Sequence, residues 1–294
     1  MAGLKEVRER IKSVKSTQQI TKAMKLVSAS KLKRATSRIT QMRPYSEKLQ
    51  DVLTNIMAST DMSDLSMGFN EVRPVNKVLL VIFSSDRGLC GGFNSNIIKA
   101  AKKVITEKYA HLDAKTQISL LPVGKKANDA FKRYGLPLND DFFDLFYNLT
   151  FENSSKIAEF IMNEFLNKEY DKVEIVYSKF KNAAVQEFVN EEFLPISKTA
   201  SKSTTSSNAD YIFEPSKIEL LGELIPKILK TTFFRYALDS NASEHGARMV
   251  AMDSATNNAS DLIKKLEIDY NKARQASITN QILEIVGGAA ALDS

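Results

Sequence analysis

The chain has 294 residues, of which 43% are hydrophobic and 26% charged, as in a globular protein of one to three domains. One cysteine, Cys90, excludes an internal disulfide, and two histidines argue against a metal centre. No apolar run is long enough to span a membrane, and the basic start lacks the apolar core of a secretory signal. Residues 1–43 hold twelve Lys/Arg and two Asp/Glu, a local charge of +10 in a chain of net +6. This basic end predicts an acidic partner, and the single cysteine fits a reducing cytoplasm.

Residues 3–57 are predicted to form one long helix. Apolar residues spaced by three and four, as in a coiled-coil seam, are Leu4, Val7, Ile11 and Val14. The next apolar positions, Ile20, Met24 and Val27, follow after a gap of six, which predicts a phase slip. Proline lacks the amide donor, so Arg43-Pro44-Tyr45 is predicted to kink or interrupt the helix. Residues 59–74 are polar and are predicted to be a linker.

The spacing of apolar residues along the chain changes after residue 75, from the helical pattern to the pattern of buried strands. Strands are predicted at 78–83, 118–123, 142–147 (weak), 173–177 and 188–196, the last at a sheet edge. Helices are predicted from 93 to about 109, near 125–134 and at 156–167. Strands that alternate with helices predict a mostly parallel sheet with crossover connections.

The last helix is predicted from Ser216 to the end, with a possible irregularity at Gly222 and Pro226. Its inward stripe is Met249, Met252, Ala255, Ala259, Leu262, Leu266, Tyr270 and Ala273. A helix this long needs a partner helix, and the first helix supplies one. The predicted fold class is α/β, with a long antiparallel coiled coil of the terminal helices and a central Rossmann-like α/β domain. The predicted limits are 1–58 and 210–294 for the coil, 75–197 for the α/β domain, and 59–74 and 198–209 for linkers.

The turn at Ser84–Asn94 is the glycine-rich connection between a strand and a helix. Gly88, Gly91 and Gly92 fit neither the dinucleotide nor the P-loop spacing, which favours a structural turn over a nucleotide site. Cys90 near a helix start resembles a nucleophile, but no base lies near it in the sequence, so a buried structural cysteine is favoured. An enzyme that uses a dinucleotide stays open as an alternative.

The basic first helix suits nucleic acid as a second alternative. Residues 1–44 contain no aromatic side chain to stack on bases, and the seam positions require a helix partner. Binding to protein is therefore favoured over binding to DNA or RNA.

The end of the chain is apolar on all sides. From Ile278 onward, Ile282, Leu283, Ile285, Val286 and Leu292 point around the whole helix axis, so other chains are expected to enclose this tip. Below the tip lies a polar collar of Asn271, Lys272, Arg274, Gln275, Thr279, Asn280 and Gln281.

Three motifs resemble the gamma subunit of the rotary, F-type ATP synthase. They are Ile11–Met24 (IKSVKSTQQITKAM), Ser85–Gly92 (SDRGLCGG), and the pair Ala247–Met249 (ARM) with Asn271–Thr279 (NKARQASIT). The resemblance covers essentially the whole chain in the correct order. It implies a rotor subunit of the central stalk, not catalytic itself and without a cofactor. This rotor couples ion-driven rotation of the c ring to ATP synthesis or hydrolysis in a ring of three alpha and three beta subunits.

The resemblance also assigns residues by position. Contacts with the beta subunit fall on Lys22, Met24, Lys25, Arg248, Arg274, Gln275, Thr279 and Gln281. The foot near the c ring and the epsilon subunit falls on Arg43, Tyr45, Tyr211 and Glu214. The implied location is peripheral, on the cytoplasmic face of the bacterial inner membrane, with no nucleic acid bound.

Two departures from the family matter. Gln281 stands where the family has glutamate, which puts an ionic role at that position in doubt. With one cysteine, the chain also lacks the dithiol switch of the chloroplast relatives.

Overall fold

The computed structural model describes residues 4–58, 68–196 and 217–292. The described residues fall into two compact units, one within Met1–Ala29 and Arg248–Ser294 and the other within Ser30–Ala247. The α-helices are α1 (Leu4–Ala58), α2 (Phe93–Lys103), α3 (Ala114–Gln117), α4 (Lys125–Phe131), α5 (Phe151–Leu166) and α6 (Lys217–Leu292). The strands are β1 (Val78–Phe83), β2 (Ile118–Val123), β3 (Lys172–Phe180) and β4 (Gln186–Leu194). Short helices of other types are η2 (Val104–Lys108), η3 (Lys132–Tyr134) and η4 (Leu145–Asn148).

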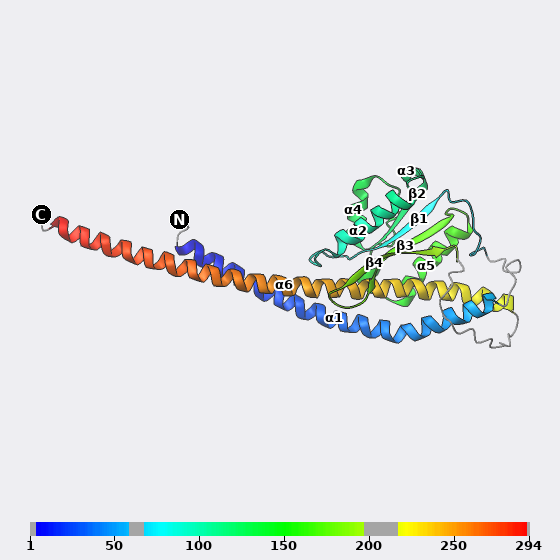
Figure 1. Cartoon of the computed structure of the whole chain (residues 1–294), viewed down its shortest axis with the longest axis horizontal. Helices are drawn as coiled ribbons and strands as arrows, with labels where there is room; N and C mark the ends of the chain where they lie inside the picture. Colours follow the sequence, from blue (N-terminus) through cyan, green and yellow to red (C-terminus); the bar gives the residue numbers. More distant parts are fainter. Residues whose placement is uncertain (1–3, 59–67, 197–216, 293–294) are drawn as a thin grey trace. The chain divides into compact units, whose positions relative to one another are not determined.

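The larger unit is built on a four-stranded sheet with the order β2-β1-β3-β4 (Figure 1). β1 pairs in parallel with β2 and β3, and β4 pairs antiparallel with β3 at the edge. The predicted strands 78–83 and 118–123 are confirmed, and so is the edge strand. The fold class predicted from the sequence is confirmed, whereas its domain limits stay a prediction. The linker residues 59–67 and 198–209 lie outside the described residues.

Both faces of the sheet are covered, as the continuous apolar strands require. Leu79, Val81 and Phe83 of β1 pack on one face with buried residues of α5 and of the first part of α6. Val78, Leu80 and Ile82 pack on the other face with α2 and α4. Phe233 of α6 has no exposed surface and contacts the Phe83 ring at 5.2 Å between centroids. The last helix is therefore also a layer of the α/β unit.

Two predictions about local structure are wrong. Residues 142–147 form no strand. Tyr147 N donates to Asp144 O (2.9 Å) in the one-turn helix η4, and Leu145 is buried beneath it. Pro44 lies inside α1 and does not interrupt it, so the predicted interruption is wrong. Pro226 lies inside α6, which continues past it as predicted. Pro44 lies on an exposed face, where water can bond to the carbonyl that loses its helical donor.

Asp239 of α6 is a buried carboxylate in the larger unit. Its side chain is 5% exposed, and Oδ1 has no hydrogen-bond partner among the described residues. Burial raises the pKa of Asp239 to about 6, against the opposing charges of Arg235, Arg43 and Lys179, while Glu191 raises it further. The charged form of Asp239 is therefore disfavoured in the folded chain.

We expect Gly246→Val to destabilise the larger unit. A Cβ at Gly246 would lie 3.1 Å from the Ala183 backbone, and overpacking of this kind costs about 1–3 kcal/mol. Denaturant unfolding followed by the near-ultraviolet circular dichroism of the buried tyrosines measures the change. Gly287→Val is the matched control in the same helix, because a Cβ there meets no atom within 4 Å, and it should leave the midpoint unchanged. Equal effects of the two substitutions would contradict the close approach at Gly246.

We expect Asp239→Asn to stabilise the chain at pH 8 and to flatten its pH dependence. The folded pKa of Asp239, about 6, is higher than the unfolded value of 3.8, so the folded state binds the proton more tightly. The charged Asp239 side chain therefore destabilises the folded chain. This destabilisation is complete above pH 6 and disappears as the pH falls towards 4. Its size at pH 8 is on the order of 2 kcal/mol. Urea unfolding of both proteins at pH 5 and pH 8 measures it, and parallel pH profiles would contradict this assignment.

Candidate partner-binding surfaces on the helix pair

In the smaller unit, the inward positions of α1 keep an unbroken spacing of three and four. They are Leu4, Val7, Ile11, Val14, Gln18, Thr21, Lys25 and Ser28, all buried or partly buried. The predicted phase slip is therefore wrong. Polar residues occupy the seam where the apolar pattern fails, and Ile20 and Val27 are each 57% exposed.

The inward positions of α6 are also spaced by three and four residues. They are Met252, Thr256, Ala259, Ile263, Leu266, Tyr270 and Ala273. Five of these residues belong to the predicted stripe, and Thr256 and Ile263 each lie one position from it. Leu262 is 38% exposed and Ile263 is 8% exposed, so the second of the two faces α1.

The two helices are joined by polar pairs along this seam. The pairs are Lys15–Glu267 (3.0 Å), Gln18–Ser260 (2.6 Å), Thr21–Thr256 (2.8 Å) and Lys25–Asp253 (2.6 Å). Residue numbers rise on α1 as they fall on α6, so the pair is antiparallel. The middle of the seam combines these hydrogen bonds and ion pairs with the buried apolar residues Met252, Ala259 and Ile263.

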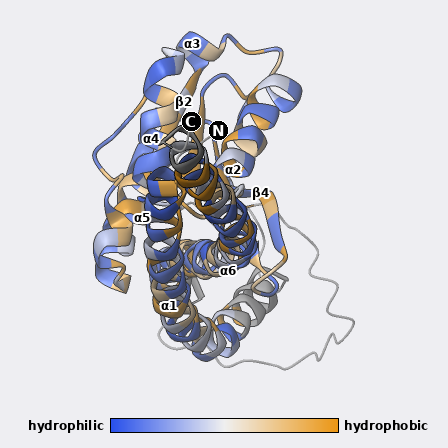
Figure 2. Cartoon of the chain, turned by 90° about the vertical axis from the view of Figure 1, so that its left-hand side faces the viewer, coloured by the Kyte–Doolittle hydropathy of each residue, from blue (hydrophilic) through white to orange (hydrophobic). Residues whose placement is uncertain are grey.

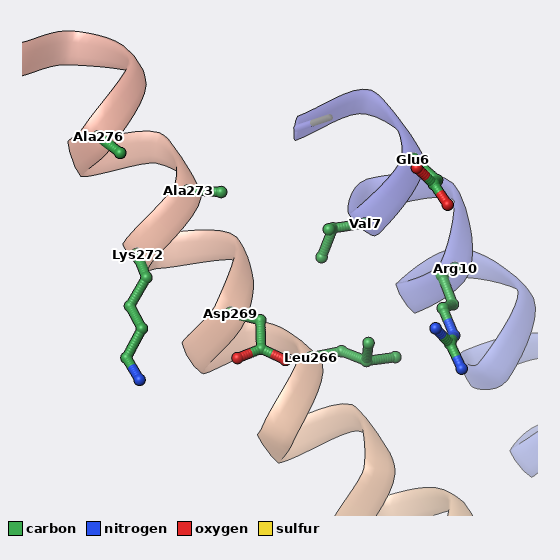
Figure 3. A pocket seen from close by; sticks show the side chains of 8 residues that line it. All are labelled: Glu6, Val7, Arg10, Leu266, Asp269, Lys272, Ala273 and Ala276. Atoms are coloured by element: carbon green, nitrogen blue, oxygen red, sulfur yellow. The ribbon is translucent and has the colours of Figure 1, made fainter. Parts of the chain in front are cut away.

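Near the start of α1 the pair leaves an open groove of about 470 Å³ (Figure 3). Val7 points from α1 towards Ala273 of α6, and Leu266 lies below them. Glu6 and Arg10 lie on the α1 side of the groove. Small side chains on α6 leave this part of the seam incompletely filled.

The predicted beta-contact residues of α1 differ in their surroundings. Lys22 is exposed and Met24 is half-buried. Lys25 is held by Asp253, which the sequence analysis did not single out. Arg248 is partly buried on α6 in the same unit. A polar groove lined by Lys22, Lys25 and Asp253 brings the two lysines together.

The collar lies on α6, about 30 Å along the helix from Asp253 at ~1.5 Å per residue. Arg274, Gln275 and Gln281 are exposed, and Thr279 Oγ1 donates to Gln275 O (3.0 Å). Arg274 has no ion pair or hydrogen bond with another described residue. The collar and the lysines of α1 are thus two separate surfaces.

The tip of α6 extends beyond the start of α1 (Figure 1). Ile282, Leu283, Ile285 and Val286 are exposed by 54%, 63%, 72% and 60%. The side chain of Leu292 lies outside the described residues. Figure 2, which faces this end, shows hydrophilic residues over much of α1, so the exposed apolar tip contrasts with its partner helix.

Two of the four residues predicted for the foot near the c ring lie in the described part of the chain. Arg43 is exposed and Tyr45 is 48% exposed, both on α1 in the larger unit. The charge of Arg43 faces Asp239, an intramolecular role that the sequence analysis missed. Tyr211 and Glu214 lie outside the described residues.

The glycine-rich turn is filled by its own side chains. Asp86 Oδ1 accepts from Lys125 N (3.2 Å), Ser84 Oγ from Ala127 N (2.8 Å) and Asn94 Oδ1 from Ser85 N (3.1 Å). Amides of this kind would otherwise face a phosphate. A Cβ at Gly124 would lie 2.2 Å from Ser84 O, which explains the glycine there.

Cys90 packs beneath this turn. It is 1% exposed, and Asn94 Nδ2 lies 3.1 Å from its sulfur. The thiol is thus covered by the turn, as expected for a structural cysteine.

Within residues 4–58, 68–196 and 217–292, no group of three or more His, Cys, Asp or Glu side chains is arranged to hold a metal ion. None of the helices in these ranges combines the length and apolar character that crossing a bilayer requires.

Comparisons with known proteins agree with the sequence motifs. The family model described as ATP synthase matches residues 3–292. The chain is 53% identical over its full length to the ATP synthase gamma chain of Christiangramia forsetii and 50% identical to that of Cytophaga hutchinsonii, and each match covers the whole relative.

Solved structures give the same result. A chain of the central stalk and c ring of the Tetrahymena thermophila mitochondrial ATP synthase matches 80% of this chain and 99% of its own length, with 25% identity and a TM-score of 0.56. A chain of the Euglena gracilis mitochondrial ATP synthase matches 98% and 94%, with a TM-score of 0.65. Its 20% identity makes this a likeness of fold.

We expect Thr21→Val to loosen the helix pair and the double variant Thr21→Val/Thr256→Val to restore it. One valine removes the cross-helix hydrogen bond and leaves the facing hydroxyl only the carbonyl of its own helix, at about 0.5–1.5 kcal/mol, whereas two valines remove both polar groups. Amide hydrogen exchange of residues 14–28 in the full chain measures the opening. Faster exchange in the double variant than in either single variant would contradict a direct hydrogen bond between the two threonines.

Proposed function

The chain belongs to the ATP synthase gamma family, and from this premise we propose how its surfaces serve a rotor of the central stalk. A rotor of this family couples ion-driven rotation of the c ring to ATP synthesis or hydrolysis. Its partners are three alpha and three beta subunits, the epsilon subunit and the c ring. The observation that carries this function is the full-length match to gamma chains at 50% identity or more. The antiparallel pair with an exposed apolar end on α6 supports it.

Coupling requires that the rotor make different contacts with the beta subunits in their different conformations. Lys22 and Met24 of α1, with Arg248 of α6, offer such contacts to an acidic surface of the beta subunits. Exposed ion pairs contribute only about 0–1 kcal/mol each, so each one can form and break in every turn. Tighter pairs would slow rotation.

Lys25 has a different part in this proposal. Its ammonium lies 2.6 Å from Asp253, so part of its charge is balanced within the chain. We assign Lys25 mainly to holding the two helices together and Lys22 to the partner.

The tip is proposed as a bearing inside the alpha–beta ring. Four large apolar side chains more than half exposed on one short segment are unusual for a surface in water. Enclosure by partner subunits would remove this surface from water. Arg274, Gln275, Thr279 and Gln281 then lie one or two turns below, where they offer hydrogen bonds to beta subunits. Gln281 does so without charge.

We infer that the subunit is not catalytic and binds no nucleotide. The support is the turn at residues 84–94, whose Asp86 and Ser84 side chains accept from the Lys125 and Ala127 amides of α4 and whose Ser85 amide donates to Asn94. Saturable binding of a nucleotide by the isolated chain at Gly88–Gly92 would contradict this assignment.

The proposed location is peripheral, on the cytoplasmic face of the bacterial inner membrane. The support is the identity of at least 50% with gamma chains of bacteria. The foot, with Arg43 and Tyr45 and the predicted residues Tyr211 and Glu214, is proposed to rest near the c ring and the epsilon subunit.

Co-purification tests the function directly. An affinity tag at the N-terminus of this chain, expressed in its native host, should bring down an ATP-hydrolysing ring of alpha and beta subunits. Recovery of the chain with nucleic acid and without the ring would favour the nucleic-acid alternative instead.

We expect Ile285→Asp to lower coupled ATP synthesis at least tenfold. A carboxylate placed in an apolar socket loses several kcal/mol because its hydration is not replaced. Proton-driven ATP synthesis in membrane vesicles measures the loss. Ile285→Leu keeps an apolar side chain and should retain activity, and Val72→Asp places the same charge at an 83% exposed residue outside the tip. Normal synthesis by Ile285→Asp would show that the tip is not enclosed.

A further inference from the structure

Residues 140–152 are acidic and aromatic in a chain that is basic overall. They contain Asp140, Asp141, Asp144 and Glu152 and no Lys or Arg, whereas the whole chain has a net charge of +6. Five aromatic residues, Phe142, Phe143, Phe146, Tyr147 and Phe151, lie among these carboxylates. This segment belongs to the α/β unit, and none of its residues is among those assigned above.

Only part of this acidic charge is balanced within the chain. Asp140 pairs with Lys132 (2.6 Å) and Glu152 pairs with Lys156 (3.2 Å). Asp141 and Asp144 are exposed, and within the described part of the chain neither has an ion pair. Two carboxylates therefore face solvent on this side of the α/β unit.

Tyr147 stands between these carboxylates and the start of α5. Its side chain is 92% exposed, although its backbone amide is hydrogen-bonded. Tyr147 N donates to Asp144 O (2.9 Å), Asn153 Nδ2 donates to Asn148 O (3.0 Å), and Leu145 is buried beneath the turn. A rigid backbone that presents an exposed tyrosine loses little entropy on binding, which makes tyrosine effective at interfaces.

A groove of about 240 Å³ lies beside this ring. Phe142, Leu145 and Ile157 give it apolar walls, and Asp144 and Tyr147 stand at its edge. Lys156 also lines it, with its charge paired to Glu152 (3.2 Å). The groove can take one apolar side chain, while the carboxylate and the aromatic ring suit an adjacent cation.

We propose that this surface binds a segment of a partner subunit that carries a Lys or Arg next to an apolar residue. The cation would contact Asp144 and the Tyr147 ring, and the apolar neighbour would enter the groove. Anionic lipid is the wrong occupant, because Asp141 and Asp144 would repel it. The inference rests on the proposed function in one respect, since the partner is taken to be another subunit of the assembled complex.

Photocrosslinking in the assembled ATP synthase tests the inference. The photoreactive residue p-benzoylphenylalanine replaces Tyr147 in one variant and Tyr134 in a matched control. Tyr134 is also an exposed tyrosine of the α/β unit (52%), but it lies beside Lys102 and follows Lys132 and Arg133. We expect the Tyr147 variant to crosslink to another subunit, within a few residues of a Lys or Arg, at least threefold more than the control.

Charge gives the second arm of the test. Asp141→Asn with Asp144→Asn should lower the Tyr147 crosslink at least threefold, and so should raising the salt from about 50 to 500 mM. Crosslinks to lipid, crosslinks to an acidic peptide, or yields unchanged by the two Asn substitutions would overturn the proposal. A complex that assembles and gives no Tyr147 crosslink would overturn this inference alone, whereas failure of the unmodified chain to co-purify with a ring would contradict the proposed function.

Discussion

The antiparallel pair of α1 and α6, here called the shaft, depends on the regular spacing of the inward residues along its seam. Inward positions repeat by three and four even where their residues are Gln18, Thr21 and Lys25, so the geometry of the pair is kept while its chemistry changes. Partly buried hydrogen-bonded pairs across the seam restrict which residues can face each other. One consequence is that Ile20 and Val27, which would fill an ordinary seam, lie outside. The middle of the helix pair thus has polar pairs beside buried Met252, Ala259 and Ile263 on its inner side, and exposed apolar residues on its outer side.

The same helix carries two kinds of packing along its length. In the larger unit, α6 is a layer of the α/β core, where Phe233 and Ala237 are fully buried. In the smaller unit, it contacts α1 along one stripe and then continues without a described partner. A continuous hydrogen-bonded helix resists twisting because each turn is bonded to the next.

The sequence predicted those features that depend on apolar residues. The runs 78–83 and 118–123 gave the parallel strands, and the paired terminal helices followed from their length. The prediction from the sequence failed where polar residues are buried in the seam or in the core. Thr21 and Ser28 in the seam look like surface residues, and so does Glu174, which is fully buried in β3 with bonds from Lys108, Tyr109 and Asn190. The strand expected at 142–147 failed for a different reason, because a run of aromatic residues also fits a turn in which only Leu145 is buried and Tyr147 is exposed.

Net charge counted from the sequence overstates what a partner meets on the first helix. Lys15 and Lys25 are held by Glu267 and Asp253 of the last helix, so their fields are partly cancelled at short range. Lys22 lies between them in the sequence and has no ion pair with another described residue. An acidic surface that passes the shaft therefore meets a row of charges of unequal strength. Unequal contacts around the axis are what a rotor needs, since a uniform charge would favour no angle over another.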